Sequence, residues 1–242
     1  FIVSISSVVY PMLSKLSTEN NKVEFNKSIV TATSTVILLV IPISVGAIIL
    51  SKPIVKVLFQ RGAFDDRAAY MTSVALVFYS IGMIGFGLRD ILGKVFYSLQ
   101  DTKTPMINGA IAMGLNIILN ISFVKFTNMQ LAGLALATSI SALVTVALLF
   151  INLRIKIGPF GGRHVLSVFL KAVISALLMA LVTYFSYKNI ANIFGVGMVK
   201  EIITLGLSIL AGALTYGICV IIFKVDEINL IINTLRKKLK KG

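Results

Sequence analysis

The sequence predicts an all-α protein that crosses a membrane several times, and three observations support this fold class. Hydrophobic residues make up 57% of the 242-residue chain and charged residues only 13%, about half the charged share of a soluble domain. Apolar runs of roughly twenty residues recur, each long enough to cross a hydrocarbon core of about 30 Å. The runs are continuous instead of alternating, which favours helices over the strands of a membrane barrel.

The chain is expected to begin inside a membrane helix. Residues 1–13 are apolar but shorter than a full span, and they carry neither the basic segment nor the cleavage site of a signal peptide. We interpret them as the end of a truncated transmembrane helix, and the chain as a fragment of a longer protein. The polar residues that follow predict a loop from Ser14 to Lys27.

Complete spans follow, each defined by a continuous apolar run. Their approximate bounds are 28–50, 68–99, 105–124 and 131–153 for a first group, and 165–187 and 198–223 for a terminal pair. Pro42 lies inside the first span and is expected to kink it. The second span is longer than a bilayer requires, so we expect its charged end to project beyond the hydrocarbon. Gly133, Ala137 and Ser141 place a small residue at every fourth position, which favours close helix contact.

The distribution of basic residues predicts the orientation. One alternate set of loops, together with the tail over residues 224–242, holds about twice as many Lys and Arg residues as the other set. This richer set, which includes the C-terminus, is expected to face the cytoplasm. Apolar residues in the tail recur every three or four positions, which is typical of an interfacial helix that binds anionic lipid. The net charge of +14 therefore indicates topology and lipid contact, and not nucleic-acid binding.

Three charged residues at the end of the second span form the first candidate site. Asp90 and Lys94 are i,i+4 neighbours on a helix and are expected to pair, with Arg89 beside them. One interpretation is that the trio marks the cytoplasmic end of the span, with long side chains reaching the interface. The other is that it lines the mouth of a polar cavity and attracts an anionic head group.

Amide side chains on the third span form the second candidate site. Asn116 and Asn120 share one helix face, and amides in hydrocarbon need hydrogen-bond partners. They serve either as structural hydrogen bonds between helices or, with Thr138 of the next span, as ligands of a monovalent cation. The span carries no carboxylate that would neutralise such an ion.

The sequence offers no catalytic centre. Arg61 and Asp65 flank Gly62 in an outer loop, where a surface ion pair is the simplest interpretation. His164 is the single histidine, in a basic loop without a carboxylate nearby in the sequence, and Cys219 lies in an apolar run as a packing residue. No nucleophile–base arrangement, nucleotide loop or metal-ligand motif is present in the sequence, so we expect a protein that is not an enzyme.

Three segments of the sequence resemble a known family. VLFQRGAFD after one span, YSLQDTKTP after the long one and GLALATS at a later one are similar to the MurJ/MviN family, the lipid II flippases of bacterial cell-wall synthesis. These belong to the multidrug/oligosaccharidyl-lipid/polysaccharide exporter superfamily. The resemblance implies that residues 14–153 form the C-terminal lobe of a two-lobe flippase. It also implies that residues 165–223 form an extra helix pair with a groove for the lipid tail.

The function implied by the resemblance is lipid II flipping by alternating access across the bacterial inner membrane, with the C-terminus in the cytoplasm. Undecaprenyl-linked lipid II would be the substrate, and a sodium ion or proton the coupling ion, with no other cofactor. The partners would be anionic lipids, the cell-wall synthesis machinery and the missing N-terminal lobe. This lobe holds the family's cavity arginines. The alternatives are a polysaccharide-unit flippase or drug exporter of the same superfamily, an intramembrane enzyme, and a structural membrane partner of cell-wall machinery.

Overall fold

The computed structural model of the chain describes residues 2–19, 21–59, 61–62, 64–129, 131–195, 197–225 and 227. In these residues all regular secondary structure is helical, without strands. The helices are α1 (Ile2–Thr18), α2 (Lys22–Ile49), α3 (Ser51–Phe59), α4 (Asp66–Ser98), α5 (Lys103–Phe126), α6 (Leu131–Ile157), α7 (Gly162–Phe194) and α8 (Met198–Ile222). Within the described residues, six helices, all except α1 and α3, are long and apolar enough to cross a membrane. The predicted fold class is therefore confirmed.

The loop predicted from Ser14 to Lys27 is wrong, because helices occupy most of it. α1 runs on to Thr18, whose hydroxyl donates to the Ser14 carbonyl at 2.9 Å. α2 already begins at Lys22, where the Asn21 side chain accepts the N–H of Glu24 at 3.3 Å. Polar side chains that close hydrogen bonds with their own backbone extend both helices beyond their apolar parts.

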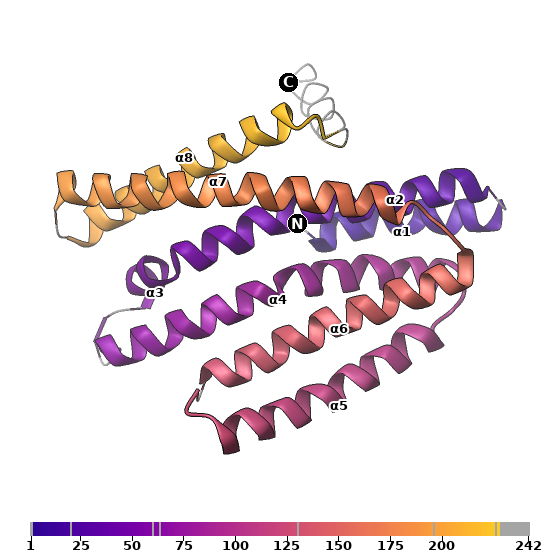
Figure 1. The fold of residues 1–242 in the computed structure, drawn as a ribbon, viewed down its shortest axis with the longest axis horizontal. Helices are drawn as coiled ribbons and strands as arrows, with labels where there is room; N and C mark the ends of the chain where they lie inside the picture. The colour runs from indigo at the N-terminus through magenta and orange to yellow at the C-terminus, as the bar shows by residue number, and fades with distance from the viewer. Residues whose placement is uncertain are drawn as a thin grey trace.

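The helices form a layered bundle in which α4 is central. α4 lies between α2 and α6, α5 packs on the far side of α6, and α7 packs against both α2 and α8 (Figure 1). The α1–α2, α4–α5 and α6–α7 connections gather at one end of the bundle, and the α3–α4, α5–α6 and α7–α8 connections at the other (Figure 1). The two ends match the two loop sets that the basic-residue count separates.

The contact between α4 and α6 depends on small residues. A Cβ added at Gly82 would lie 2.8 Å from the Ser139 Cα atom, and one added at Gly85 would lie 2.9 Å from the Ala142 carbonyl carbon. The Ser139 hydroxyl in turn donates to the Phe78 carbonyl at 2.6 Å. On the other face of α6, a Cβ at Gly133 would meet the Phe123 Cβ atom of α5 at 2.8 Å. The close packing expected at Gly133 is thus confirmed.

Pro42 leaves α2 continuous, and the hydrogen bond that it removes is replaced from another helix. Proline has no N–H, so the Leu38 carbonyl, four residues earlier, loses its partner within the helix. The Tyr216 hydroxyl of α8 donates to this carbonyl at 2.8 Å. In an apolar setting an unpaired carbonyl is costly, so this bond stabilises α2 and also attaches the terminal helix pair to the bundle.

We expect the substitution Tyr216→Phe to destabilise the protein by about 1–3 kcal/mol, because it leaves the Leu38 carbonyl unpaired. In a Pro42→Ala background the alanine N–H supplies the missing bond, so the same substitution should cost roughly 1 kcal/mol or less. Thermal unfolding of the four variants of the complete protein in detergent measures this cycle. If Tyr216→Phe lowers the stability equally with proline and with alanine at position 42, the alanine N–H does not replace the tyrosine hydroxyl as donor to the Leu38 carbonyl.

Candidate functional site

The charged trio on α4 lies against α1 and is only partly brought together. The Lys94 ammonium donates to the Ser6 hydroxyl and lies 3.5 Å from the Asp90 carboxylate, with 23% of its side chain exposed. The predicted Asp90–Lys94 contact is thus present. Arg89 is exposed and places its guanidinium 5.8 Å from the centre of the Phe86 ring. The Lys94 ammonium therefore contacts Ser6 and Asp90, whereas the Arg89 guanidinium lies at the surface.

An apolar hollow lies next to this charge. α1, α2 and α4 enclose a volume of about 260 Å³, lined only by apolar side chains, and Phe86 forms part of its wall. Phe86 also carries the Arg89 guanidinium on its ring face. The surface thus places one exposed cation beside an apolar recess, which suits an amphipathic anion.

The amide residues of α5 meet Thr138 of α6, as the interpretation of the cluster as a cation site requires. Asn120 Nδ2 donates to Asn116 Oδ1 at 3.0 Å, and Asn116 Nδ2 donates to the Thr138 hydroxyl at 3.4 Å. Thr138 donates in turn to the Leu134 carbonyl at 2.9 Å. Asn120 Oδ1 is buried and has no hydrogen-bond partner among the described residues. The cluster therefore combines a structural link between two helices with one unused oxygen acceptor.

Arg61 and Asp65 do not pair with each other in the described part of the chain. Arg61 Nη2 donates to the Leu58 carbonyl at 3.1 Å, at the end of α3, and Asp65 accepts the N–H of Ala68 at 2.8 Å. Between them Gly62 adopts a left-handed φ of 61°. The two residues thus end α3 and begin α4, and the surface ion pair expected from the sequence is wrong.

The SLQDTKTP segment forms a tight corner between α4 and α5. Gln100 adopts a left-handed φ of 57°, and its N–H donates to the Tyr97 carbonyl at 3.0 Å. The N–H of Asp101 donates to the Phe96 carbonyl at 2.9 Å, which completes a Schellman ending for α4. The Asp101 carboxylate then accepts the N–H and the hydroxyl of Thr104 at 3.0 and 2.7 Å, which starts α5.

A lysine from α6 closes this corner. Lys156 Nζ lies 2.5 Å from Asp101 Oδ2. This ammonium, together with the Thr104 donors, lowers the pKa of Asp101 from its ordinary value of 3.8 to about 2. Asp101 therefore remains ionised over the physiological pH range and links the ends of α4, α5 and α6.

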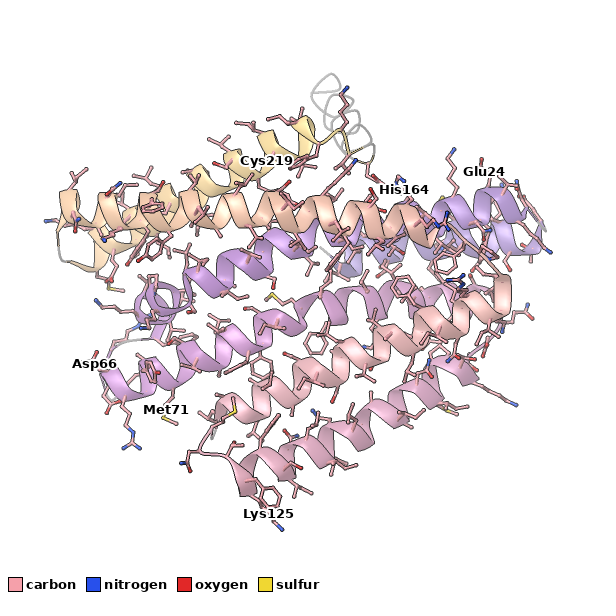
Figure 2. The ribbon with its side chains drawn as sticks, viewed as in Figure 1. Glu24, Asp66, Met71, Lys125, His164 and Cys219 are labelled. Atoms are coloured by element: carbon pink, nitrogen blue, oxygen red, sulfur yellow. The ribbon has the colours of Figure 1, made fainter. Side chains whose placement is uncertain are left out.

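His164 differs from the sequence expectation in two respects. It lies in the first turn of α7 and not in a loop (Figure 2), and its Nε2 is 2.8 Å from Glu227 Oε1. Glu227 is 5% exposed and follows the end of α8. The sequence places no carboxylate beside His164, but the fold does, because Glu227, which is distant in sequence, supplies one. The rest of the predicted amphipathic tail over 224–242 lies mostly outside the described residues.

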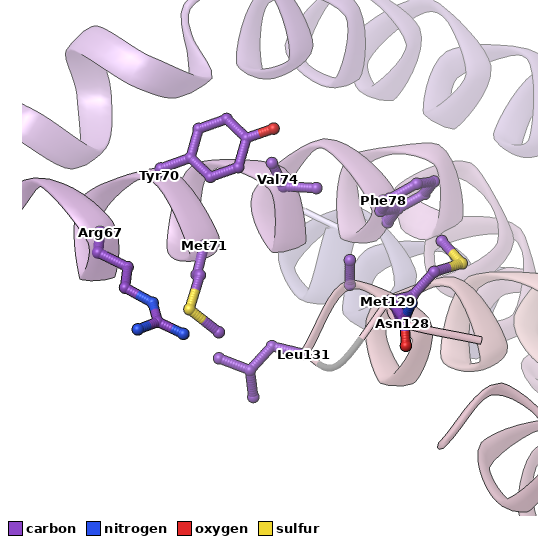
Figure 3. A pocket seen from close by; sticks show the side chains of 9 residues that line it. Arg67, Tyr70, Met71, Val74, Phe78, Asn128, Met129 and Leu131 are labelled. Atoms are coloured by element: carbon purple, nitrogen blue, oxygen red, sulfur yellow. The ribbon is translucent and has the colours of Figure 1, made fainter. Parts of the chain in front are cut away.

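A cleft opens at the N-terminal ends of α4 and α6. It has a volume of about 410 Å³, and its walls carry Arg67 and Met71 from α4 opposite Asn128 and Leu131 (Figure 3). Asp66 and Lys125 lie at this same end of the bundle, whereas Glu24 lies at the other (Figure 2). The cleft is largely apolar with one cation at its edge.

Sequence reasoning did not single out several of these contacts. The sequence presents Lys156 only as one of several basic residues near a helix end. It does not distinguish Asn152, whose Nδ2 donates to Asn108 Oδ1 at 3.1 Å, or Tyr216. For Tyr216 a signal did exist, because Pro42 frees a carbonyl that some donor must satisfy. For the Asp101–Lys156 and His164–Glu227 contacts, a single sequence holds no signal, since each joins residues that only the packing of helices brings together.

Comparisons with known proteins agree on one family. A family model described as lipid II flippase MurJ matches residues 1–205. The probable lipid II flippase MurJ of Vibrio cholerae is 38% identical over 156 residues, which cover 64% of this chain and 29% of that protein. The lipid II flippase MurJ of Thermosipho africanus is 35% identical over 185 residues, which cover 76% of this chain and 36% of that protein.

A solved structure extends the match to the fold. The lipid II flippase MurJ in an inward closed conformation is 31% identical, with a TM-score of 0.73 over 92% of this chain and 43% of that one. The chain spans between 29% and 43% of the length of these three proteins.

The corner at Asp101 generates a prediction for pH. The pKa of Asp101 in the folded protein is below its ordinary value, so the ionised carboxylate stabilises the fold above about pH 4. That contribution should disappear as the pH falls from about 4 to about 2. We expect Asp101→Ala to lower the unfolding free energy at pH 7 by about 1–2 kcal/mol, and the difference from wild type to shrink in acid.

Asp65→Ala is the matched control, because Asp65 caps α4 without an ion pair to another helix in the described residues. Thermal unfolding of both variants between pH 7 and pH 3 measures the two effects. A loss in Asp101→Ala no larger than that in Asp65→Ala at pH 7 would show that Lys156 adds nothing to the cap.

Proposed function

This chain belongs to the MurJ family, and we propose that it forms the C-terminal lobe and the terminal helix pair of a lipid II flippase. The observation that carries the proposal is the match over residues 1–205 together with the shared fold over 92% of the chain. The lobe comprises residues 14–153 and the pair residues 165–223. An N-terminal lobe of the same protein supplies the other half of the transport path.

The mechanism that we propose is alternating access, in which two lobes rock so that a polar path opens first to one side and then to the other. The diphosphate–sugar head crosses between the lobes and no covalent bond changes, so the protein is a transporter and not an enzyme. On this chain Arg89 is the residue best placed to meet the head group, because Lys94 is held by Asp90 and Ser6. The apolar hollow beside Phe86 accepts the first part of an aliphatic chain.

The terminal pair offers a surface for the rest of the lipid tail. Exposed apolar residues follow one face of α7 at helical spacing: Leu170, Ile174, Leu177 and Leu181. A similar stripe follows α8: Leu207, Leu210, Leu214 and Ile218. Such faces meet either acyl chains or a polyprenyl chain, and Tyr216 holds the pair beside the lobe. This supports a groove for the polyprenyl tail on residues 165–223.

A monovalent cation is the coupling ion that the amide cluster suits. Asn116 Oδ1 and Asn120 Oδ1 are amide oxygens on one face of α5, and Thr138 adds a hydroxyl. The unused Asn120 oxygen is buried, so a bound cation would satisfy it. Oxygen donors without a carboxylate favour sodium over a divalent ion, since little negative charge is available.

We place the protein in the bacterial inner membrane with its C-terminus in the cytoplasm. The basic residues support this orientation because the ends of the bundle match the two loop sets (Figure 1). Undecaprenyl-linked lipid II, anionic lipids and the cell-wall synthesis machinery are the partners expected of such a protein.

Complementation tests the proposed function. The complete protein that carries this chain should restore growth and outward exposure of lipid II in bacteria depleted of their own flippase. The double substitution Arg89→Ala/Lys94→Ala should reduce lipid II exposure by at least about tenfold, because one lost charge-assisted contact costs roughly 1.5–3 kcal/mol. Lipid II that stays inside despite normal membrane insertion of the wild-type protein would contradict the assignment.

Lys15→Ala/Lys27→Ala is the matched control, since it removes two positive charges from the same end of the bundle. Both side chains are largely exposed, and among the described residues Lys15 pairs with Glu19, just beyond the end of α1, and Lys27 with Glu24 of α2. Unchanged flipping in both double variants, at equal protein levels, would mean that the α4 charges only mark the interface.

The cation proposal predicts specific stabilisation by sodium. At a tenfold excess of sodium over its Kd, binding should raise the unfolding free energy by about 1.4 kcal/mol relative to choline at equal ionic strength. Asn120→Leu should abolish this difference in thermal unfolding, whereas Asn128→Leu, outside the cluster, should preserve it. An equal sodium effect in wild type and Asn120→Leu would exclude the amides as ligands.

A further inference from the structure

Another pocket, with several polar residues in its lining, lies between α5 and α6 at the end opposite the amide cluster, and the proposed function does not use it. Its volume is about 490 Å³. The lining combines polar and apolar residues: Thr104, Asn108, Asn152, Lys156, Phe96, Ile107 and Ile155. It opens beside the corner that Asp101 forms, at the end of the bundle where SLQDTKTP lies.

The inner wall of the pocket carries an unpaired donor. Asn108 is 3% exposed, and its Oδ1 accepts a hydrogen bond from Asn152 Nδ2 at 3.1 Å. With the oxygen in use, the amide nitrogen must donate elsewhere, yet Asn108 Nδ2 has no partner in the described part of the chain. A buried N–H₂ without an acceptor costs free energy, so the pocket suits a ligand that brings acceptor oxygens.

The mouth of the pocket is positively charged. Lys156 has three N–H donors, and Asp101 is the acid with which it pairs in the described residues, so the ammonium retains donors for a ligand. Lys103 and Arg154 are exposed on the same two helix ends. Three cations against one carboxylate leave an excess of positive charge, which favours an anion.

The rim indicates what kind of anion enters. Ile107 and Ile155 flank the pocket and are 53% and 77% exposed. Exposed apolar residues continue along α5 towards its other end, including Ile111 and Ile118. A ligand whose oxygens reach Asn108 can therefore lay a hydrocarbon chain along α5, as a membrane lipid does and a free anion does not.

We propose that this pocket binds the phosphodiester of an anionic phospholipid, with Asn108 Nδ2 and Lys156 Nζ as donors. The inference depends on the membrane setting of the helices and not on lipid II transport, because the pocket is separate from Arg89 and from the amide cluster. Asp101 assists by holding Lys156 at the mouth, where it reaches the lipid without entering the apolar interior.

Lipid titration of the complete protein in detergent tests the proposal, with native mass spectrometry counting bound molecules. Phosphatidylglycerol should bind more tightly than zwitterionic phosphatidylcholine. Asn108→Leu and Lys156→Gln should each weaken phosphatidylglycerol binding on the order of tenfold, as expected for the loss of one hydrogen bond to a charged group. Lys125→Gln, at the opposite end of α5 (Figure 2), is the matched charge control and should leave the Kd unchanged.

The outcomes separate the possible occupants. If Asn108→Leu folds and keeps the wild-type Kd, the amide does not bind the lipid and the proposal fails. If inorganic phosphate displaces phosphatidylglycerol at millimolar concentration, the site binds free anions and the commitment to lipid is wrong. If Asn108→Leu does not fold, equal Kd values for Lys156→Gln and Lys125→Gln overturn the proposal. Lipid binding is measured without flipping, so failure here leaves the complementation result intact.

Discussion

The close approach of α4 to its two neighbours is the constraint on which the rest of the structure depends. Between helices in lipid the hydrophobic effect contributes little, so packing and hydrogen bonds must hold them together. Gly82 and Gly85 admit the backbone of α6, and a Cβ at Gly87 would lie 2.9 Å from a Val36 methyl group of α2. Serine hydroxyls bridge both contacts, from Ser44 to the Ser80 carbonyl and from Ser139 to the Phe78 carbonyl. The charged trio, the apolar hollow and the cleft at the N-terminal ends of α4 and α6 all take their positions from this central helix.

Polar groups in the apolar interior need partners, and two of the buried polar atoms that lack one lie in the candidate sites. The Leu38 carbonyl finds Tyr216, and Lys94 finds Ser6 and Asp90. Two amide atoms on α5 remain without partners among the described residues, an oxygen of Asn120 and the nitrogen of Asn108. One suits a cation and the other an anion. The two ends of one helix thus offer opposite chemistry to ligands.

Hydropathy and local spacing made most of the fold predictable from the sequence. The membrane-crossing helices follow from apolar runs, and the Asp90–Lys94 contact follows from four-residue spacing. Helix ends were less predictable, because Asn21 and Asp65 extend helices into polar sequence through contacts with their own backbone. Contacts such as Asp101 with Lys156 were beyond reach, since they depend on how α4, α5 and α6 cross. The SLQDTKTP segment, which resembles the family, is a corner whose residues form the hydrogen bonds that end α4 and begin α5.

The bond between Tyr216 and the Leu38 carbonyl also has a consequence for sequence variation. Proline at position 42 is tolerated because the Tyr216 hydroxyl, on a helix distant in sequence, donates the hydrogen bond that the missing backbone N–H would donate. A lineage that loses the proline no longer needs the hydroxyl, and a lineage that loses the hydroxyl first carries an orphaned carbonyl in hydrocarbon. The order of substitution is therefore constrained. Pro42 must be replaced by a residue with a backbone N–H before Tyr216 can be replaced without loss of stability. Positions 42 and 216 should accordingly form a linked pair, although they lie in separate helices near opposite ends of the chain.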